Sequence, residues 1–182
     1  TIPPGVQTTA PILDRTFGQG SGQGYIALAA GSIKNATDEP DSTIASAAQG
    51  ALPFTVTPGS PDPQVLILHT HATETYQTWD TPVYDPDFTA RTKDTTLNMC
   101  AVGEAMTKVL NDAGITTLHD TTLHDSPSYT ESYARSAQTA RRYLEEYPSI
   151  KVVLDVHRDA MESGDARVRP EHRWTASRLH RS

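Results

Sequence analysis

The hydrophobic positions of this chain gather in two short runs, and each run leads directly to histidine. Residues 65–68 read Val-Leu-Ile-Leu and are followed by His69 and His71. Residues 151–157 read Lys-Val-Val-Leu-Asp-Val-His and repeat the pattern. A run that is apolar on both faces is typical of a parallel strand covered by helices on each side. The pattern therefore predicts two buried strands that each deliver a histidine to the carboxyl edge of a sheet.

Helical periodicity fills the sequence between the two runs. Apolar residues recur at helical spacing over residues 98–113, and Gly114 supplies a natural stop. A short strand is predicted at 115–119 and a second helix at 129–147, ahead of a proline. The order strand, helix, strand, helix, strand indicates a parallel sheet with right-handed crossovers. We therefore predict an α/β fold with a mostly parallel sheet and flanking helices.

The sequence before the first apolar run has a different character. Residues 1–24 are rich in Pro, Gly, Gln and Thr, which predicts a flexible segment. Short strands are predicted at 25–28 and 54–56. Beyond the first run, residues 75–94 are long and aromatic for a simple connection, so we expect them to form a lid or one wall of a groove.

Composition changes divide the chain into three parts. A group of prolines near residue 60 marks a boundary, so residues 1–63 are interpreted as a small β-rich segment with a linker. Residues 64–166 form the predicted α/β domain. Residues 167–182 are dense in Arg and His and lack an apolar period, and we interpret them as an aberrant basic tail. The sheet is accordingly expected to be truncated at its C-terminal side.

Charge and cysteine content exclude several classes of protein. The net charge is −7, and the five Arg and one Glu of residues 166–182 leave residues 1–165 with 10 basic and 21 acidic groups, a net of −11. An acidic body argues against nucleic acid as a partner. Cys100 is the single cysteine, which excludes an internal disulfide and a cysteine-rich zinc site, and we expect it in the core. No apolar stretch is long enough for a membrane span. The chain opens with Thr1 and has no signal peptide, so we expect a piece of a longer precursor.

The two histidine-bearing strand exits predict a metal site. If the strands are neighbours, His71 and His157 converge at one edge of the sheet, and Glu74 lies three residues after the first histidine. Zinc binds neutral imidazole and carboxylate, and a catalytic zinc keeps three protein ligands plus water. A strand-end histidine alone is more often structural, so the prediction depends on the pair. His69, further inside the strand, is expected to orient a ligand.

The third ligand stays open between several residues. The repeated Leu-His-Asp of residues 116–125 offers His119, which ends the predicted strand, and His124 with Asp125 in the loop that follows. Asp155 is expected to be buried in its strand unless it serves the site, and a lone buried carboxylate is costly. Arg158 is expected to pair with a neighbouring aspartate or to bind an anionic group of a substrate.

Three motifs of the chain resemble one protein family. Residues 65–76 (VLILHTHATETY), 123–136 (LHDSPSYTESYARS) and 152–160 (VVLDVHRDA) are similar in order and spacing to the stage II sporulation protein P family. Residues 24–37 resemble the N-terminal portion of that family, and the resemblance covers about residues 17–162.

This resemblance implies a peptidoglycan hydrolase of endospore-forming bacteria. The family is similar in fold to zinc-dependent N-acetylmuramoyl-L-alanine amidases and also has endopeptidase activity on stem peptides of the cell wall. Its members act during engulfment of the forespore, outside the cytoplasm and associated with the membrane, with an anchor that would lie upstream of Thr1. Expected partners are peptidoglycan, a sporulation lytic transglycosylase and a membrane anchor protein.

The resemblance also implies roles for individual residues. His71 and His157 match the zinc-binding histidines, and His124 matches the histidine of the His-Asp loop as the third ligand. Glu74 would be a ligand or an orienting group, and Glu74 and Arg158 are the candidate catalytic residues. The family continues to a late glutamate that serves as general base, which nothing after residue 162 resembles. We therefore expect weak zinc binding and impaired amidase activity.

Two other functions compete with this interpretation. A non-catalytic peptidoglycan-binding module would use the acidic body and the aromatic segment 75–94 as a groove without chemistry. A metal-dependent phosphoester hydrolase would use the His-x-His motif, but such sites hold two metals and more aspartate ligands than the strand ends of this chain supply.

Overall fold

The computed structural model divides the chain into two compact units. One unit consists of Thr1–Ala10 with Phe54–Asp165, and the other of Pro11–Pro53 with Ala166–Ser182. The residues that the structure describes are 2–6, 9–15, 20–29, 31–79, 82–158 and 167–170. The boundaries predicted near residues 63 and 166 stay predictions.

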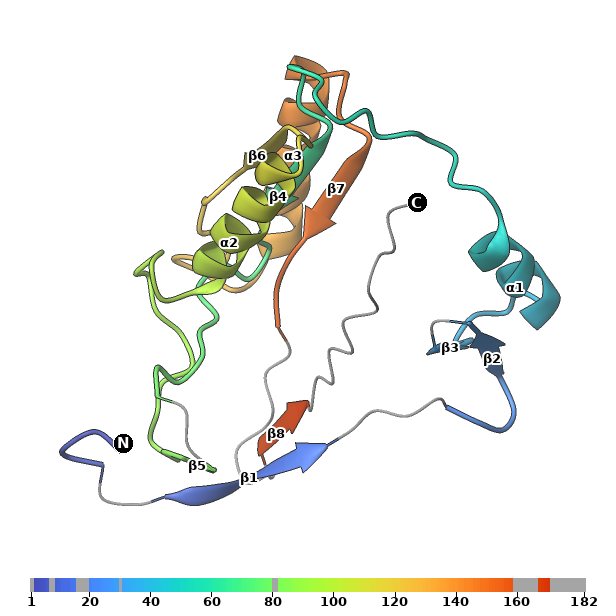
Figure 1. The fold of residues 1–182 in the computed structure, drawn as a ribbon. Coiled ribbons are helices and arrows are strands. Elements are labelled where there is room, and N and C mark those ends of the chain that lie inside the picture. Colours follow the sequence, from blue (N-terminus) through green and yellow to red (C-terminus); the bar gives the residue numbers. More distant parts are fainter. Residues whose placement is uncertain are drawn as a thin grey trace, which may run out of the picture. The chain divides into compact units, whose positions relative to one another are not determined.

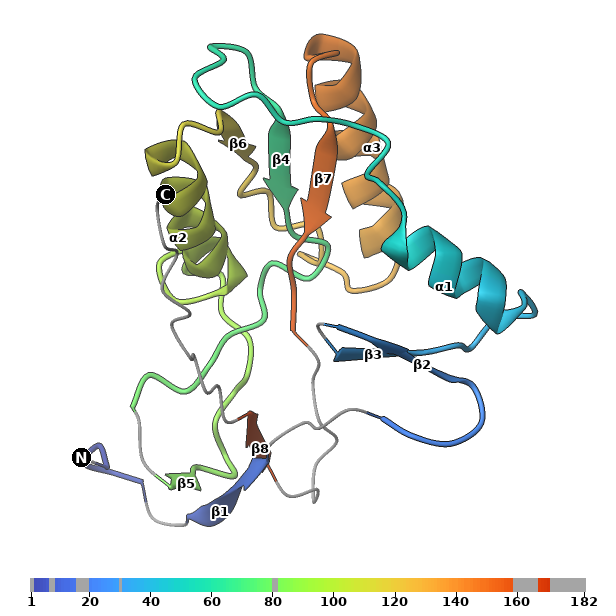
Figure 2. The same cartoon turned by 45° about the vertical axis from the view of Figure 1, so that its right-hand side comes forward.

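A three-stranded parallel sheet forms the centre of the first unit. It consists of β4 (Val65–Leu68), β6 (Thr117–His119) and β7 (Val152–Asp155) in the order β6-β4-β7 (Figure 2). Both neighbours pair with β4 in parallel, with Leu66 opposite Leu118 on one side. This sheet confirms the predicted parallel α/β architecture. Because all three strands run the same way, their carboxyl ends meet at one edge.

The two long helices cover opposite faces of this sheet (Figures 1 and 2). These helices are α2 (Met99–Asp112) and α3 (Ser132–Glu146). On the α3 face, Leu66 and Leu68 form the core cluster with Ile150 and pack against partly buried residues of the helix. On the other face, His69 lies against the α2 backbone. The covering of both faces explains why all four residues of β4 are buried and apolar.

The predicted helix limits agree with the structure for α2 but not for α3. Asn98 caps α2, since its side chain accepts a hydrogen bond of 2.9 Å from the Cys100 backbone N–H. Cys100 is buried as expected, and burial raises the pKa of its thiol to about 11. The predicted start of the second helix at Tyr129 is wrong. Glu131 adopts a left-handed φ of 67°, so the helix begins only after it and Tyr129 lies in the preceding loop.

The segment 75–94 is mostly irregular in the part of it that the structure describes. Its strand β5 (Val83–Tyr84) spans two residues. The start of the segment is nevertheless fixed by backbone pairing, because the Thr75 N–H donates to the Ala90 carbonyl at 3.1 Å. This pairing holds one end of the aromatic segment against the exit of β4.

The second unit contains smaller elements. The strand β2 (Tyr25–Leu28) was predicted, and it pairs antiparallel with β3 (Gly31–Lys34). The helix α1 (Asp41–Gln49) follows. The strand β1 (Ala10–Arg15) pairs in parallel with β8 (Arg167–Pro170).

Three further predictions concern segments outside the parallel sheet. The predicted strand at 54–56 is wrong, because these residues form a bend and irregular backbone. The predicted flexible segment 1–24 contains β1, which forms by pairing with a distant strand that local sequence does not reveal. The predicted truncation and the late basic tail concern residues 159–182, which apart from 167–170 lie outside the described residues.

Among the described helices, none is long and apolar enough to cross a membrane.

Replacing Leu66 by alanine tests the core of the first unit. Leu66 is fully buried in the central strand. We expect Leu66→Ala to lower the free energy of unfolding by about 2–5 kcal/mol, because it leaves a cavity between the sheet and α3. Urea titration followed by circular dichroism measures this change. Leu144→Ala, at a position that is 42% exposed on α3, is the matched control and should cost about 1 kcal/mol or less. Equal losses for the two variants would contradict the assigned core.

Candidate metal centre

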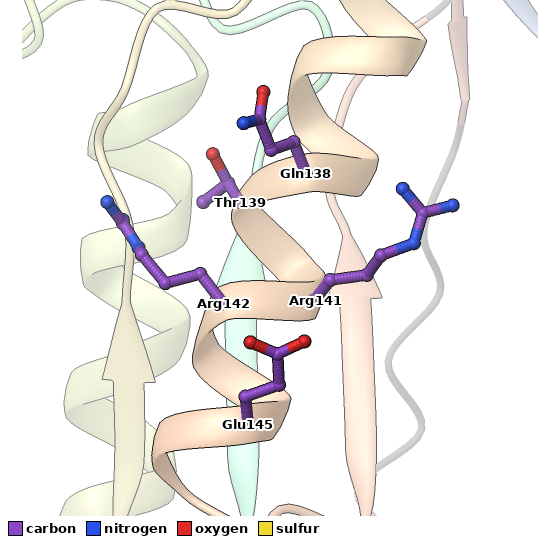
Figure 3. Close-up of a pocket in the computed structure, with 5 residues that line it drawn as sticks. All are labelled: Gln138, Thr139, Arg141, Arg142 and Glu145. Carbon is purple, nitrogen blue, oxygen red and sulfur yellow. The ribbon is translucent and has the colours of Figure 1, made fainter.

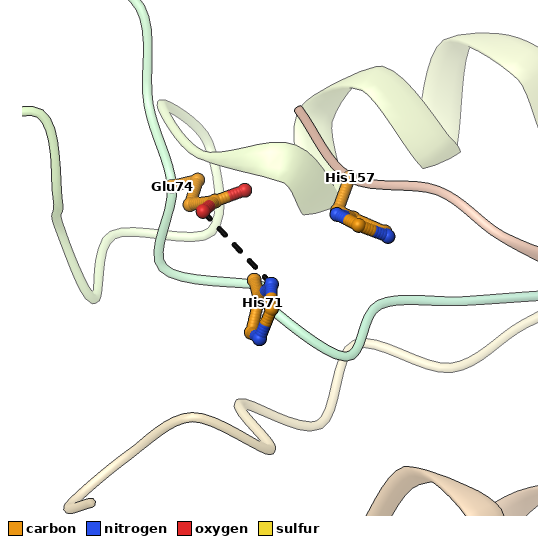
Figure 4. Close-up of side chains that lie close together, drawn as sticks. All are labelled: His71, Glu74 and His157. Carbon is orange, nitrogen blue, oxygen red and sulfur yellow. Dashed lines mark ion pairs between the residues drawn. The ribbon is translucent and has the colours of Figure 1, made fainter. Parts of the chain in front are cut away.

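His71, Glu74 and His157 come together at the carboxyl edge of the sheet (Figure 4). One potential ligand atom from each of the three lies within 4.8 Å of the other two. His71 and Glu74 are buried, whereas His157 is exposed. The predicted pair of histidines and the carboxylate that follows the first of them are therefore neighbours in space.

Two local features of the chain produce this arrangement. The strands β4 and β7 are parallel neighbours with Leu68 opposite Asp155, so their exits leave the sheet side by side. After β4 the chain turns, and the Glu74 N–H donates to the His71 carbonyl at 3.2 Å. This turn brings Glu74 Oε1 to 4.0 Å from His71 Nδ1.

Hydrogen bonds hold the Glu74 carboxylate but leave one atom of His71 without a partner. Glu74 Oε2 accepts from the Arg158 backbone N–H at 3.2 Å, and Oε1 lies 3.4 Å from Arg91 Nη2. Within the described residues, His71 Nε2 is buried without a hydrogen-bond partner. The nitrogen of His71 that faces the Glu74 carboxylate is the other one, Nδ1, at 4.0 Å from Oε1 (Figure 4). The group offers two imidazoles and a carboxylate, a donor set that zinc accepts in catalytic sites.

Aromatic rings surround the imidazole of His71. Tyr129 stacks on it with 4.5 Å between ring centroids and 17° between planes. Tyr133 and His157 each contact it edge-on at 5.2 Å. Both tyrosines are more than half exposed, so they form an open aromatic border to the site. The contact of these rings with His71 was not predicted from the sequence, although both tyrosines lie in the motif 123–136.

The structure does not bring His124 to this group. Its ring is buried, with Nδ1 2.8 Å from the His69 carbonyl and Nε2 2.9 Å from Thr139 Oγ1. Since both nitrogens already have partners, the expectation that His124 is the third ligand needs correction. Among the described residues, Glu74 takes that place in the group.

Asp155 and Arg158 lie near the group, but their burial and contacts differ from the predictions. Asp155 is exposed rather than buried, and its carboxylate accepts from the Thr70 N–H at 2.8 Å and from Thr70 Oγ1 at 2.7 Å. It thereby ties the end of β7 to the exit of β4. Arg158 contributes its backbone N–H to Glu74, and its guanidinium lies 5.3 Å from the ring of Tyr76. A catalytic role of the Arg158 side chain stays a prediction.

His69 supports the site through the backbone. Its Nδ1 lies 2.6 Å from the Val156 carbonyl, which can only accept, so Nδ1 carries the proton. Its Nε2 lies 2.9 Å from His119 Nε2. Burial is the main cause that lowers the pKa of His69, and the neutral ring suits this pairing. His69 thus fixes the residue immediately before His157.

Gly103 provides the space for this histidine pair. A Cβ atom at Gly103 would lie 2.5 Å from His69 Nε2 and still closer to His119 Nε2. Contacts this short force the histidines or α2 to move. The glycine is therefore required by packing rather than by its backbone conformation.

Gly103→Ala is expected to destabilise the protein, although helix propensity alone would make it stabilising. Propensity alone would stabilise the helix by roughly 1 kcal/mol. The clash with the two histidines should instead lower the free energy of unfolding by about 1–3 kcal/mol, as measured by urea titration. Ala105→Gly, at an exposed position of the same helix, reports the propensity term and should cost about 1 kcal/mol. A stabilised Gly103→Ala variant would refute the described packing.

A separate hollow lies on α3 (Figure 3). It measures about 550 Å³ and is lined by Gln138, Thr139, Arg141, Arg142 and Glu145. All five residues belong to one helix, and none belongs to the group around His71. The hollow is therefore separate from the group at the sheet edge.

Comparison with known proteins gives one match. The chain matches the family model of stage II sporulation protein P over residues 24–173, which is most of its 182 residues. No curated protein and no solved structure matches the chain. The matched range includes all three residues of the candidate metal group.

Proposed function

Because this chain belongs to the stage II sporulation protein P family, a family of sporulation proteins, we propose that it is a zinc-dependent peptidoglycan hydrolase. The bond cleaved is the amide between N-acetylmuramic acid and L-alanine, and bonds of the stem peptide are a second class of substrate. The observation that carries the proposal is the group of His71, Glu74 and His157 at the carboxyl edge of the sheet.

The residues of the group suit amide hydrolysis. Zinc held there would polarise the amide carbonyl and lower the pKa of a bound water toward ~7. His71 and His157 supply imidazole nitrogens, and Glu74 supplies the carboxylate as third ligand. The exposed side of His157 leaves the centre open to a polymeric substrate. The half-exposed rings of Tyr129 and Tyr133 offer apolar surface beside it.

We propose engulfment of the forespore as the setting, outside the cytoplasm and associated with the membrane. Peptidoglycan is the proposed substrate. A sporulation lytic transglycosylase and a membrane anchor protein are the proposed partners. Membership of the family supports the link to sporulation.

Zinc content and wall hydrolysis together test the function. We expect the purified chain to bind one zinc ion weakly and to release soluble muropeptides from purified cell walls at a low rate, because the late glutamate of the family has no counterpart among the residues that resemble it. His71→Ala and His157→Ala should each lose the zinc, measured by elemental analysis, and reduce release to background. Lys108→Ala, an exposed change on α2, is the control and should behave as wild type. Wall binding that survives both histidine changes in a zinc-free chain would support a non-catalytic binding module instead.

Glu74→Gln separates a ligand from a proton acceptor. The change keeps the shape of the side chain and removes its charge. If Glu74 is a ligand, zinc affinity should fall at least ~100-fold, because even loss of a residue behind the ligands costs 10–100-fold. Competition with a chromogenic chelator measures this affinity. Unchanged zinc affinity together with lost hydrolysis would assign Glu74 as the proton acceptor and contradict its role as ligand.

A further inference from the structure

Arg91 lies between two buried carboxylates beside the metal group. Its Nη1 donates to Asp125 Oδ2 at 2.8 Å and to Thr73 Oγ1 at 3.1 Å. Its Nη2 donates to Glu74 Oε1 at 3.4 Å. The side chains of Asp125 and Glu74 are 0% and 4% exposed, so each depends on protein partners rather than water. The planar guanidinium can serve both carboxylates at once, which a point charge cannot.

The guanidinium of Arg91 also contacts the ring of Tyr129, which stacks on the imidazole of His71. Arg91 Cζ lies 5.1 Å from the centroid of Tyr129, within the range of a cation–π contact. Tyr129 in turn stacks on His71. Arg91 therefore contacts Glu74 directly and acts on His71 through Tyr129.

Backbone pairing fixes Arg91 in this position. Glu74 and Arg91 form an antiparallel bridge, and the Thr92 N–H donates to the Thr73 carbonyl at 2.8 Å. The Asn98 side chain, which caps α2, also donates to the Thr92 carbonyl at 3.1 Å. The segment that carries Arg91 is thus joined to both the exit of β4 and the start of α2.

We propose that Arg91 is a positioning residue of the metal centre, which fixes the Glu74 carboxylate and the His71 ring in the arrangement that binds zinc. This inference rests on the proposed function. Without Arg91, the hydrogen bond from the Arg158 backbone still restrains Glu74, but only at Oε2. Loss of Arg91 therefore weakens zinc binding without removing a ligand.

The partner Asp125 gives the arrangement its charge balance. An arginine alone beside a divalent cation would raise the local positive charge and oppose binding. The ion pair with Asp125 offsets that charge. Arg91 can then orient Glu74 without adding net positive charge at the site.

Arg91→Gln tests the inference through zinc affinity. We expect one zinc per chain, as in wild type, with an affinity about 10–100-fold weaker by chelator competition. Arg91→Lys keeps the charge but loses the planar fork, so it should also bind more weakly than wild type. Lys93→Gln makes the same charge change at an exposed position of the same segment and should leave the affinity unchanged.

A double variant separates positioning from folding. Arg91→Gln leaves Asp125 buried without its cation, which would destabilise the unit. Arg91→Gln with Asp125→Asn removes both charges, so thermal stability should recover while zinc affinity stays weak. The absorption spectrum of the cobalt-loaded variant should also differ from that of wild type, because the ligands are held differently.

The outcomes distinguish a failure of the positioning role from a failure of the proposed function. Wild-type zinc affinity in Arg91→Gln, or its return in the double variant, would overturn the positioning role and leave the proposed function intact. Weak affinity in a stable double variant supports the positioning role. A wild-type chain that binds no zinc overturns the proposed function and this inference with it.

Discussion

The pairing of β4 with β7 is the interaction on which the site depends. In the sheet, Leu68 lies opposite Asp155, and the Val156 N–H continues the ladder to the Leu68 carbonyl at 2.9 Å. Side chains then extend the pairing past the end of both strands, through Asp155 to Thr70 and through His69 to Val156. The chain segments that lead to the two histidines of the group are therefore held together before any metal is considered.

Polar groups beyond the strands follow one physical rule, which is that burial requires a partner. The buried rings of His69 and His124 have partners on both nitrogens, and the buried carboxylate of Asp125 has three donors. The ring of His71 differs from these two histidines, because its Nε2 is buried without a hydrogen-bond partner within the described residues. Its Nδ1 faces the Glu74 carboxylate at 4.0 Å, and His157 completes a group of two imidazoles and a carboxylate. The chemistry of this group is what indicates a metal site.

Much of the fold and part of the site could be predicted from sequence. The apolar runs identify β4 and β7, and the parallel topology makes the meeting of His71 and His157 a consequence of adjacent strand ends. Arg91 escaped prediction because it lies in an irregular segment, where no period indicates which side chains face the site.

Other predictions failed because they depended on tertiary contacts that the local sequence does not indicate. His124 was assigned to the metal because its motif suited the resemblance, but its actual partner Thr139 belongs to α3 and becomes its neighbour only through tertiary packing. In the second unit, β1 pairs with β8 across most of the chain, and local sequence carries no signal for such a contact. Crystallography of the zinc-loaded protein, with anomalous data at the zinc absorption edge, would locate the ion itself. We expect one strong anomalous peak bounded by His71, Glu74 and His157, and a peak elsewhere or none at all would contradict the assignment of the metal centre.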